Sequence, residues 1–285
     1  MKSVRICVAA ITAGVVCIAA MIGILSAAIY AENESGNSFI GLMYHQVLKD
    51  ESRAGKYIIT PNELESDLAY LSENGYVSVL PSQLVKIREQ GGRLPEKTVV
   101  ITFDDGYETG LYYVLPLLKK YGMKAVINVV GSYTDEYSRI NEEGKHLSYA
   151  YLTWNEIKTL SDSGYVEIGN HTYDMHSNNG DRNGCARKEN ESDEQYRTVL
   201  YEDVARLSDK LQQVTGKRPV AFAYPFGSLS EGSAEIIGSA GISVFMTCCE
   251  QPCSMNRNGR ILINRYNRES GRTAQQICEE FNNAF

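Results

Sequence analysis

Hydrophobic and polar positions alternate along the chain in two distinct patterns. From Phe39 onward, short runs rich in β-branched and aromatic residues, such as KTVVITF over 97–103, alternate with longer segments such as 60–75, whose apolar residues recur at helical spacing. The short runs are typical of buried strands and the longer segments of amphipathic helices. Strands that alternate with helices favour parallel pairing through right-handed crossovers. The pattern predicts an α/β fold of seven or eight such units in a closed or partly closed β/α barrel, with an open doubly wound sheet as the alternative.

Local signals indicate where two helices begin and where the longest loop lies. Thr60 and Thr153 each precede a glutamate by three positions, which is the spacing of a capping box, and Pro61 suits the first helical position. Gly75 is a typical stop signal for the first of these helices. The polar interval from His176 to about Asp193 predicts a surface loop or an insertion.

The first part of the chain differs from the rest, because residues Ile6 to Ala31 carry no charge and follow two basic residues. This run exceeds the core of about 7 to 15 residues that is typical of a signal peptide, and as a helix it can cross about 30 Å of hydrocarbon. We therefore expect a single-pass transmembrane anchor over 1–31 and one domain over 32–285 outside the cytoplasm, at the cell membrane. Small residues at 26–28 make cleavage and secretion the alternative.

Composition limits the binding and redox properties of this domain. The chain has a formal net charge of −7 and no cluster of basic residues, which argues against nucleic acid as a partner. Five cysteines lie beyond the apolar segment, and an odd number leaves at least one thiol unpaired or bonded to another chain. They are Cys185, Cys248, Cys249, Cys253 and Cys278, of which either Cys248 or Cys249 could close a small loop with Cys253.

Ionisable side chains follow several of the expected strands at the point where each strand ends. His45 lies near the end of the first strand, Asp104 and Asp105 follow VVITF directly, and His171 follows YVEIG and one asparagine. In a β/α barrel the C-terminal ends of the strands share one face, and that face carries the chemistry. These residues, distant in sequence, are therefore expected to converge.

The adjacent carboxylates of Asp104 and Asp105 need an explanation. Like charges side by side raise each other's pKa unless a cation shares the site, although an Asp-Gly pair alone also fits a turn. Two imidazoles and one carboxylate make a suitable site for a divalent metal that activates water. A metal would keep Asp105 ionised as a ligand and leave Asp104 to accept a proton.

Three motifs carry a resemblance to a known family: TFDDG at 102–106, HTYDMH at 171–176 and AYPFG at 223–227. In this order on alternating strands and helices, they resemble the polysaccharide deacetylase family of carbohydrate esterases, from about Phe39 to the end of the chain. The resemblance implies a distorted (β/α)7-8 barrel and a hydrolase that uses a divalent metal. Zinc suits such a ligand set, and cobalt, nickel and iron suit it as well.

The same resemblance assigns roles to individual residues. It implies that Asp104 is the catalytic base and that Asp105, His171 and His176 are the metal ligands. It also implies that the backbone N–H of Tyr224, which precedes Pro225 in AYPFG, helps to hold the oxyanion.

The sequence departs from the usual family pattern in the placement of its histidines. The two ligand histidines are five positions apart instead of four, and on a helix one extra residue would rotate the second imidazole by about 100°. We therefore expect His176 to lie on a loop. No histidine follows His176, whereas MYH stands at the front of the domain.

These departures resemble the branch of the family that deacetylates poly-β-1,6-N-acetylglucosamine, in which the strand order is circularly permuted. The mechanism needs an acid to protonate the leaving amine. Two of the four histidines are the implied metal ligands, and His146 lies in a polar stretch that is typical of a solvated loop. In a permuted barrel His45 is therefore the candidate for this acid. The family often places an arginine before its Pro-Tyr motif. Arg265, in INRYN at another strand end, is the candidate for this residue and is expected to contact the oxyanion or the substrate.

The expected activity is metal-dependent hydrolysis of N-acetyl groups on a cell-surface or cell-wall polysaccharide that contains N-acetylglucosamine. Peptidoglycan, poly-N-acetylglucosamine and chitin-like oligomers all present this acetamide, and the sequence indicates no protein partner. An O-acetyl esterase, such as one that acts on acetylated xylan, needs the same site and is one alternative. The other is an inactive glycan-binding module of the envelope, which predicts a broken set of site residues.

Overall fold

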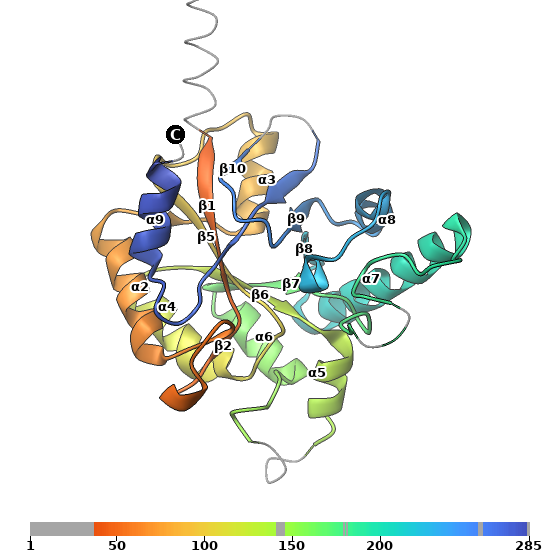
Figure 1. The fold of residues 1–285 in the computed structure, drawn as a ribbon, viewed down its shortest axis with the longest axis horizontal. Helices are drawn as coiled ribbons and strands as arrows, with labels where there is room; N and C mark the ends of the chain where they lie inside the picture. The colour runs from red at the N-terminus through yellow and green to blue at the C-terminus, as the bar shows by residue number, and fades with distance from the viewer. Residues whose placement is uncertain (1–36, 141–145, 179, 181, 256–258, 284–285) are drawn as a thin grey trace, which may run out of the picture.

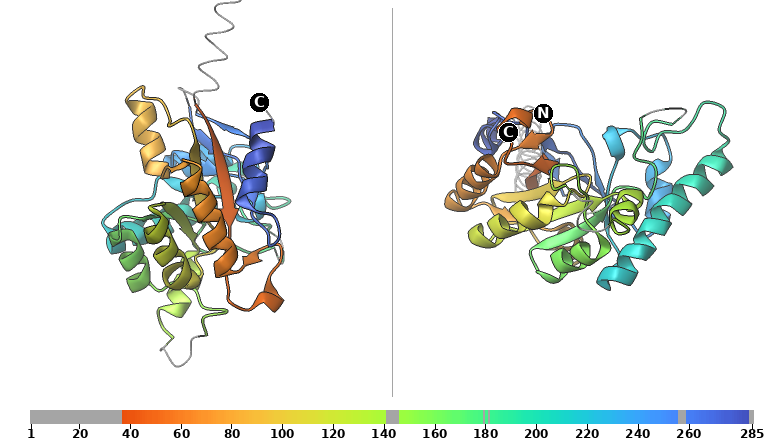
Figure 2. Two further views of the ribbon diagram at one scale, coloured as in Figure 1. Left: turned by 90° about the vertical axis from the view of Figure 1, so that its left-hand side faces the viewer. Right: turned by 90° about the horizontal axis from the view of Figure 1, so that it is seen from below.

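The computed structural model describes residues 37–140, 146–178, 180, 182–255 and 259–283. The expected anchor over 1–31 lies outside these residues. Within the described part, none of the helices combines the length and the apolar character of a membrane-spanning segment. The domain itself is a barrel of mostly parallel strands with helices on its outside (Figures 1 and 2).

The central sheet runs around the barrel largely in chain order. Its parallel strands are β1 (Ser38–Tyr44), β5 (Thr98–Phe103), β6 (Ala125–Val129), β7 (Val166–Asn170), β8 (Ala221–Ala223), β9 (Val244–Met246) and β11 (Ile261–Ile263). The stretch 261–267 nearly closes the ring, because β11 pairs with β9 and β12 (Tyr266–Asn267) then pairs with β1. The predicted barrel is therefore confirmed, and the open doubly wound sheet is excluded.

Three short additions extend this sheet or lie beside it. β4 (Val77–Ser78) runs parallel to β5, and β10 (Cys253–Ser254) pairs antiparallel with β1. β2 (Gln46–Val47) and β3 (Ile58–Ile59) form a separate parallel pair. The antiparallel strand was not expected, because a two-residue strand leaves no periodic signal in the sequence.

The helices cover the outside of the barrel, and α7 lies on the opposite side of the molecule from α2 and α9 (Figure 1). Their bounds are α2 (Pro61–Glu73), α3 (Pro81–Glu89), α4 (Leu115–Tyr121), α5 (Gly131–Tyr137), α6 (Trp154–Asp162), α7 (Asp193–Thr215), α8 (Ser233–Ser239) and α9 (Ala274–Asn283). Single turns occur at Glu51–Arg53, Gly110–Val114 and Pro225–Gly227. Both predicted capping boxes are confirmed, because Thr60 and Thr153 each exchange hydrogen bonds with the glutamate three residues later.

The alternation of side chains along β5 separates two packed layers. Val99 and Ile101 belong to the cluster that includes Leu68 of α2 and Leu118 of α4, whereas Val100 packs with a second cluster that includes Val126. Thr102 and Asp104 follow Val100 on the same face of the chain, since side chains alternate along a strand. The interior of the barrel thus becomes polar toward the C-terminal end of β5.

All five cysteines of the described domain are free thiols, so the small disulfide loop is not present in the structure. Cys185, Cys253 and Cys278 are buried, and Cys248 and Cys249 are exposed. The Cys253 thiol donates to the backbone oxygen of Asn264 at 3.0 Å, which satisfies it without a disulfide partner.

Candidate active site

A pocket of about 560 Å³ opens at the C-terminal ends of the barrel strands. It is lined by Met43, His45, Lys56, Tyr57, Asp104, Asp105, Tyr107, His171, His176, Asn178, Tyr224, Phe226, Cys248, Glu250 and Asn267. The predicted convergence of strand-end residues is confirmed, since three histidines and both carboxylates meet there. Pro225 and Arg265 are not part of this lining.

Asp105, His171 and His176 form a compact set of metal-binding side chains. One ligand atom from each lies within 4.8 Å of the others. The nearer Asp105 oxygen, Oδ1, is 3.5 Å from Nε2 of His171 and 3.1 Å from Nε2 of His176. One carboxylate and two imidazoles at such spacing fit a divalent metal such as zinc, so the chemistry of these donors agrees with a metal centre.

The two imidazoles are oriented by partners on their far sides. Nδ1 of His171 lies 2.8 Å from the backbone oxygen of Ala223, which makes Nδ1 the protonated nitrogen and leaves Nε2 as the lone-pair donor. The Tyr133 hydroxyl donates its single proton to the His176 backbone oxygen at 3.1 Å, so it accepts from Nδ1–H of the same residue, which lies 3.3 Å away. Each ring therefore presents Nε2 to Asp105.

The sharp turn after β5 explains how adjacent carboxylates avoid each other. Asp105 and Gly106 both have a φ of 71°, the left-handed region, which is unusual for a residue other than glycine. A side chain at Gly106 would also lie 3.0 Å from Val129, so only glycine fits. Strained backbone of this kind is concentrated at functional sites, and here it directs Asp105 to the histidines while Asp104 stays inside the barrel.

Asp104 is fixed by a buried network. Arg265 donates to both of its oxygens, at 2.7 and 2.8 Å, and Asn128 donates to Oδ1 at 2.7 Å. The arginine is itself held by the Thr102 hydroxyl at 3.1 Å and the Thr247 carbonyl at 2.9 Å. Burial raises the pKa of the Asp104 carboxyl, but the charge and hydrogen bonds of Arg265 outweigh burial and hold that pKa below its ordinary value.

Asp105 is also held in its charged form. Burial raises the pKa of its carboxyl, but the contacts with His171 and His176 reverse the shift, so the net pKa lies below the ordinary value. An ionised carboxylate is the form that binds a metal.

His45 contributes an imidazole on the β1 side of the pocket. Its ring lies edge-on to Tyr57, with 4.8 Å between the ring centroids. Nδ1 is buried and has no hydrogen-bond partner among the described residues. Burial lowers the pKa of the His45 imidazole, and the charges of Asp105 and Asp104 offset only part of that shift.

The structure corrects the expectation for Tyr224. Its backbone N–H donates to the Met246 carbonyl at 3.2 Å and so continues the hydrogen bonding between β8 and β9. The N–H that was expected to hold the oxyanion is therefore already occupied. Pro225 has no N–H and begins a single turn, in which Phe226 takes a left-handed φ of 57°. Phe226 is 47% exposed and its ring lies 4.7 Å from that of His176, so it forms part of the pocket wall.

Arg265 is also located differently from the expectation. Its side chain is fully buried and faces Asp104 rather than the open pocket. The prediction that Arg265 contacts the substrate directly is therefore wrong. The sequence signal, an arginine at a strand end, located the residue correctly but not the partner that it faces.

Several residues that support or line the site could not be predicted from the sequence. Asn128 lies in the apolar strand β6, and a single polar residue in such a run could have indicated an inward contact. Gly169 on the neighbouring strand makes room for it, because a Cβ there would lie 2.0 Å from the Asn128 amide oxygen. Tyr133, Lys56 and Glu250 lie in loops or a short helix and carry no recognisable local pattern.

Comparison with known proteins agrees with this geometry. The family model for polysaccharide deacetylase matches residues 91–245, which is more than half of the chain. Among curated relatives, poly-β-1,6-N-acetyl-D-glucosamine N-deacetylase of Escherichia coli (strain K12) is 27% identical over 231 residues, covering 74% of this chain and 34% of that protein. The enzyme of the same name from Staphylococcus aureus (strain MRSA252) is 24% identical over 243 residues, covering 80% of this chain and 79% of that protein. The chain thus spans about a third of the length of its Escherichia coli relative.

Solved structures share the fold over most of the domain. A de-N-acetylase from Aggregatibacter actinomycetemcomitans superposes with a TM-score of 0.72 at 25% identity, covering 85% of this chain and 99% of that one. IcaB from Ammonifex degensii gives a TM-score of 0.68 at 26% identity, covering 86% and 97%. From the matched family model and the shared barrel, this chain belongs to the polysaccharide deacetylase family.

Proposed function

We propose that this protein is a metal-dependent hydrolase that removes N-acetyl groups from a polysaccharide containing N-acetylglucosamine. The observation that carries the proposal is the joint presence, in one pocket, of the Asp105, His171 and His176 set and of Asp104 beside it. Relatives named as poly-β-1,6-N-acetyl-D-glucosamine N-deacetylases support an acetamide on such a glycan as the substrate. The complete set of residues argues against an inactive binding module.

The metal would be held by Asp105, His171 and His176. A divalent ion bound there supplies Lewis-acid polarisation of a carbonyl and a lowered pKa for water. Zinc suits the two imidazoles and one carboxylate, and cobalt, nickel and iron remain alternatives.

Asp104 is proposed as the general base that takes a proton from the attacking water. Arg265 and Asn128 fix its carboxylate in one orientation, and the low pKa keeps it ionised at neutral pH. The strong pairing also weakens Asp104 as a base, so its position beside the metal ligands matters more than its intrinsic basicity. Arg265 acts on the reaction through Asp104 and is therefore a positioning residue.

His45 is proposed as the acid that protonates the leaving nitrogen. It faces the same pocket from the end of β1. Burial lowers the pKa of its imidazole, and the charges of Asp105 and Asp104 oppose that shift and favour the protonated form that an acid needs. For the oxyanion, the next backbone N–H after that of Tyr224 belongs to Phe226, which lies on the pocket wall. Backbone donors that point at a developing negative charge stabilise the tetrahedral state.

We also propose that Ile6–Ala31 anchors the domain to the cell membrane, with residues 32–285 outside the cytoplasm. The length of the uncharged run and the two basic residues before it support this location. Full-length protein that fractionates with membranes, and a domain released by protease added from outside, are the expected results. A mature N-terminus near residues 28–32 in the culture fluid would instead indicate cleavage and secretion.

The activity is tested by mass spectrometry of candidate oligomers after incubation with the metal-loaded protein. Poly-β-1,6-N-acetylglucosamine, peptidoglycan fragments, chitin oligomers and acetylated xylan are compared, with and without a chelator. Loss of acetyl mass from an N-acetylated glycan, abolished by the chelator, supports the proposal. Loss only from acetylated xylan would identify an O-acetyl esterase, and no loss from any of them would indicate a binding module.

A further inference from the structure

The loop from His171 to His176 has an unusual backbone that connects the two proposed metal ligands. Thr172 is fully buried and has a left-handed φ of 73°, which a β-branched residue rarely adopts. Such a conformation persists only where the surroundings determine it. With five positions between the two histidines, the placement of their imidazoles therefore depends on contacts that hold this loop from outside the pocket.

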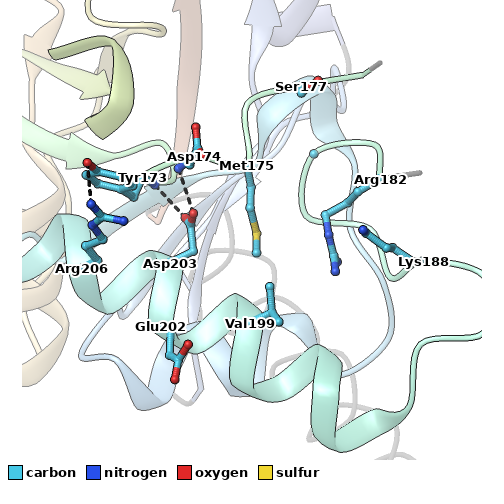
Figure 3. Close-up of a pocket in the computed structure, with 11 residues that line it drawn as sticks. Tyr173, Asp174, Met175, Ser177, Arg182, Lys188, Val199, Glu202, Asp203 and Arg206 are labelled. Carbon is cyan, nitrogen blue, oxygen red and sulfur yellow. Dashed lines mark hydrogen bonds between the residues drawn. The ribbon is translucent and has the colours of Figure 1, made fainter. Parts of the chain in front are cut away.

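Those contacts come from α7. Asp203 accepts the backbone N–H of Tyr173 on Oδ1 at 2.7 Å and that of Asp174 on Oδ2 at 2.8 Å (Figure 3). The preceding N–H, of Thr172, donates to the Asn170 side chain at 2.8 Å. Asn170 in turn donates to the Val204 carbonyl at 2.9 Å and to the Ser208 hydroxyl at 3.1 Å. Three consecutive N–H groups between the histidines are thus accepted by side chains that belong to α7 or are bonded to it.

The side chain of Tyr173 strengthens the same connection. The Arg206 guanidinium lies over its ring at 3.6 Å and donates to its hydroxyl at 2.8 Å (Figure 3). The hydroxyl also donates to Asp135, which accepts the Lys210 ammonium at 2.7 and 2.9 Å. Asp203, Arg206 and Lys210 all project from α7, so one helix contacts the loop at several points.

We propose that Asp203 is a positioning residue for the metal centre: by accepting two backbone N–H groups, it sets the loop geometry that brings His176 onto Asp105 and His171. The inference rests on the proposed metal-dependent function. Asp203 does not line the catalytic pocket, so it would act only through the loop. The buried apolar residues of α7, such as Leu200 and Leu207, occupy other positions of the helix.

The test measures metal affinity, which a purely structural contact remote from the ligands would leave unchanged. Full-length metal-free protein is titrated with Co²⁺, and the visible absorption of the bound ion reports both affinity and ligand geometry. Asp203→Ala is expected to lower Co²⁺ affinity by about 10- to 100-fold, the range that follows removal of residues that orient metal ligands. Asp203→Asn keeps one acceptor oxygen and loses the other, so its Co²⁺ affinity should fall by less than that of Asp203→Ala but by more than about twofold, and its spectrum should be closer to that of the wild type.

Glu202→Gln is the matched control, because Glu202 neighbours Asp203 on α7 and lines the same outer cavity without lining the catalytic pocket. It should bind Co²⁺ as the wild type does. If Asp203→Ala does not fold, the comparison rests on Asp203→Asn. Affinity within about twofold of the wild type in a folded Asp203 variant would overturn the inference alone. A wild-type protein that binds no Co²⁺ would overturn the proposed function and this inference with it.

Discussion

Arg265 donates two parallel hydrogen bonds to Asp104, Nη1 to Oδ1 at 2.7 Å and Nη2 to Oδ2 at 2.8 Å, across a sequence separation of 161 residues. The pair joins the C-terminal end of β5 to the segment between β11 and β12, where the barrel closes. Both side chains are almost completely buried, so neither charge is solvated by bulk water. The barrel closure and the candidate base therefore depend on the same contact.

Arg265→Met is expected to destabilise the domain strongly, by about 3 to 5 kcal/mol, because it leaves the Asp104 charge buried without a cation. The double variant Asp104→Asn with Arg265→Met should be more stable than Arg265→Met alone, since the unpaired charge is then absent. Urea denaturation of the wild type, both single variants and the double variant gives the four free energies of unfolding of a double-mutant cycle. Additive effects would show that the two residues do not depend on each other.

Asp104→Asn should retain bound metal and lose turnover by a factor of about 10² to 10⁴, the usual cost of removing a general base. The amide keeps the size of the side chain but cannot accept the proton. His171→Ala is the contrasting variant, in which metal content and activity should fall together because a ligand is removed. Elemental analysis and acetate release measure both quantities. Near-normal turnover in Asp104→Asn would exclude its role as base, and unchanged metal in His171→Ala would exclude that ligand.

Sequence reasoning was accurate where a local pattern has one structural outcome. The buried run of β5, the capping boxes at Thr60 and Thr153 and the convergence of strand ends each follow from periodicity, side-chain capping or barrel geometry. It was less accurate where the outcome depends on a partner distant in sequence. The Tyr224 N–H is occupied because β9 lies beside it, and Arg265 faces inward because Asp104 is there.

The contribution of α7 to the site could not be predicted for the same reason. Asp203 lies in the middle of an amphipathic helix rich in charged residues, and its pattern is that of an ordinary solvated face. Only the folded loop places two N–H groups at its carboxylate. The anchor over 1–31 and the permuted strand order relative to other family members stay predictions.

The pH dependence of stability provides an independent check on Asp203. Burial raises its pKa from 3.8 to about 6, although the N–H groups of Asp174 and Tyr173 partly oppose the shift. A carboxyl with a raised folded pKa contributes stability that is complete below the unfolded pKa and is lost as the pH rises through about 6. Between pH 3.5 and 7, the free energy of unfolding of the metal-free wild type should therefore fall by at most about 3 kcal/mol relative to that of Asp203→Asn. Denaturation curves with chelator present measure this difference, and a constant difference would show that Asp203 is solvated.

The thiols should differ in reactivity according to their burial. Burial raises the pKa of Cys253 to about 12 and that of Cys278 to about 11, and Cys185 is fully buried, so these three should react slowly with iodoacetamide at pH 8. Cys249 is exposed and should react first. Cys248 should follow it, because burial of its thiol raises its pKa even though part of the residue is exposed. Peptide mass spectrometry after timed labelling gives the order, and rapid labelling of Cys185 in folded protein would contradict the packing of α7 and α8.

The role of His45 is tested by the leaving group. An amide nitrogen leaves poorly without a proton, whereas the alcohol of an activated ester needs none. Among the other histidines, His171 and His176 face Asp105, and His146 is exposed beyond the pocket, so His45 is the imidazole available as an acid in the described domain. His45→Ala should retain metal but lose at least about two orders of magnitude in amide hydrolysis, and much less on an activated acetate ester. His45→Gln, which keeps a polar side chain of similar reach, should show the same contrast. Equal losses on amide and ester would indicate that His45 only supports the pocket wall beside Tyr57, and full activity on the amide would remove it from the mechanism.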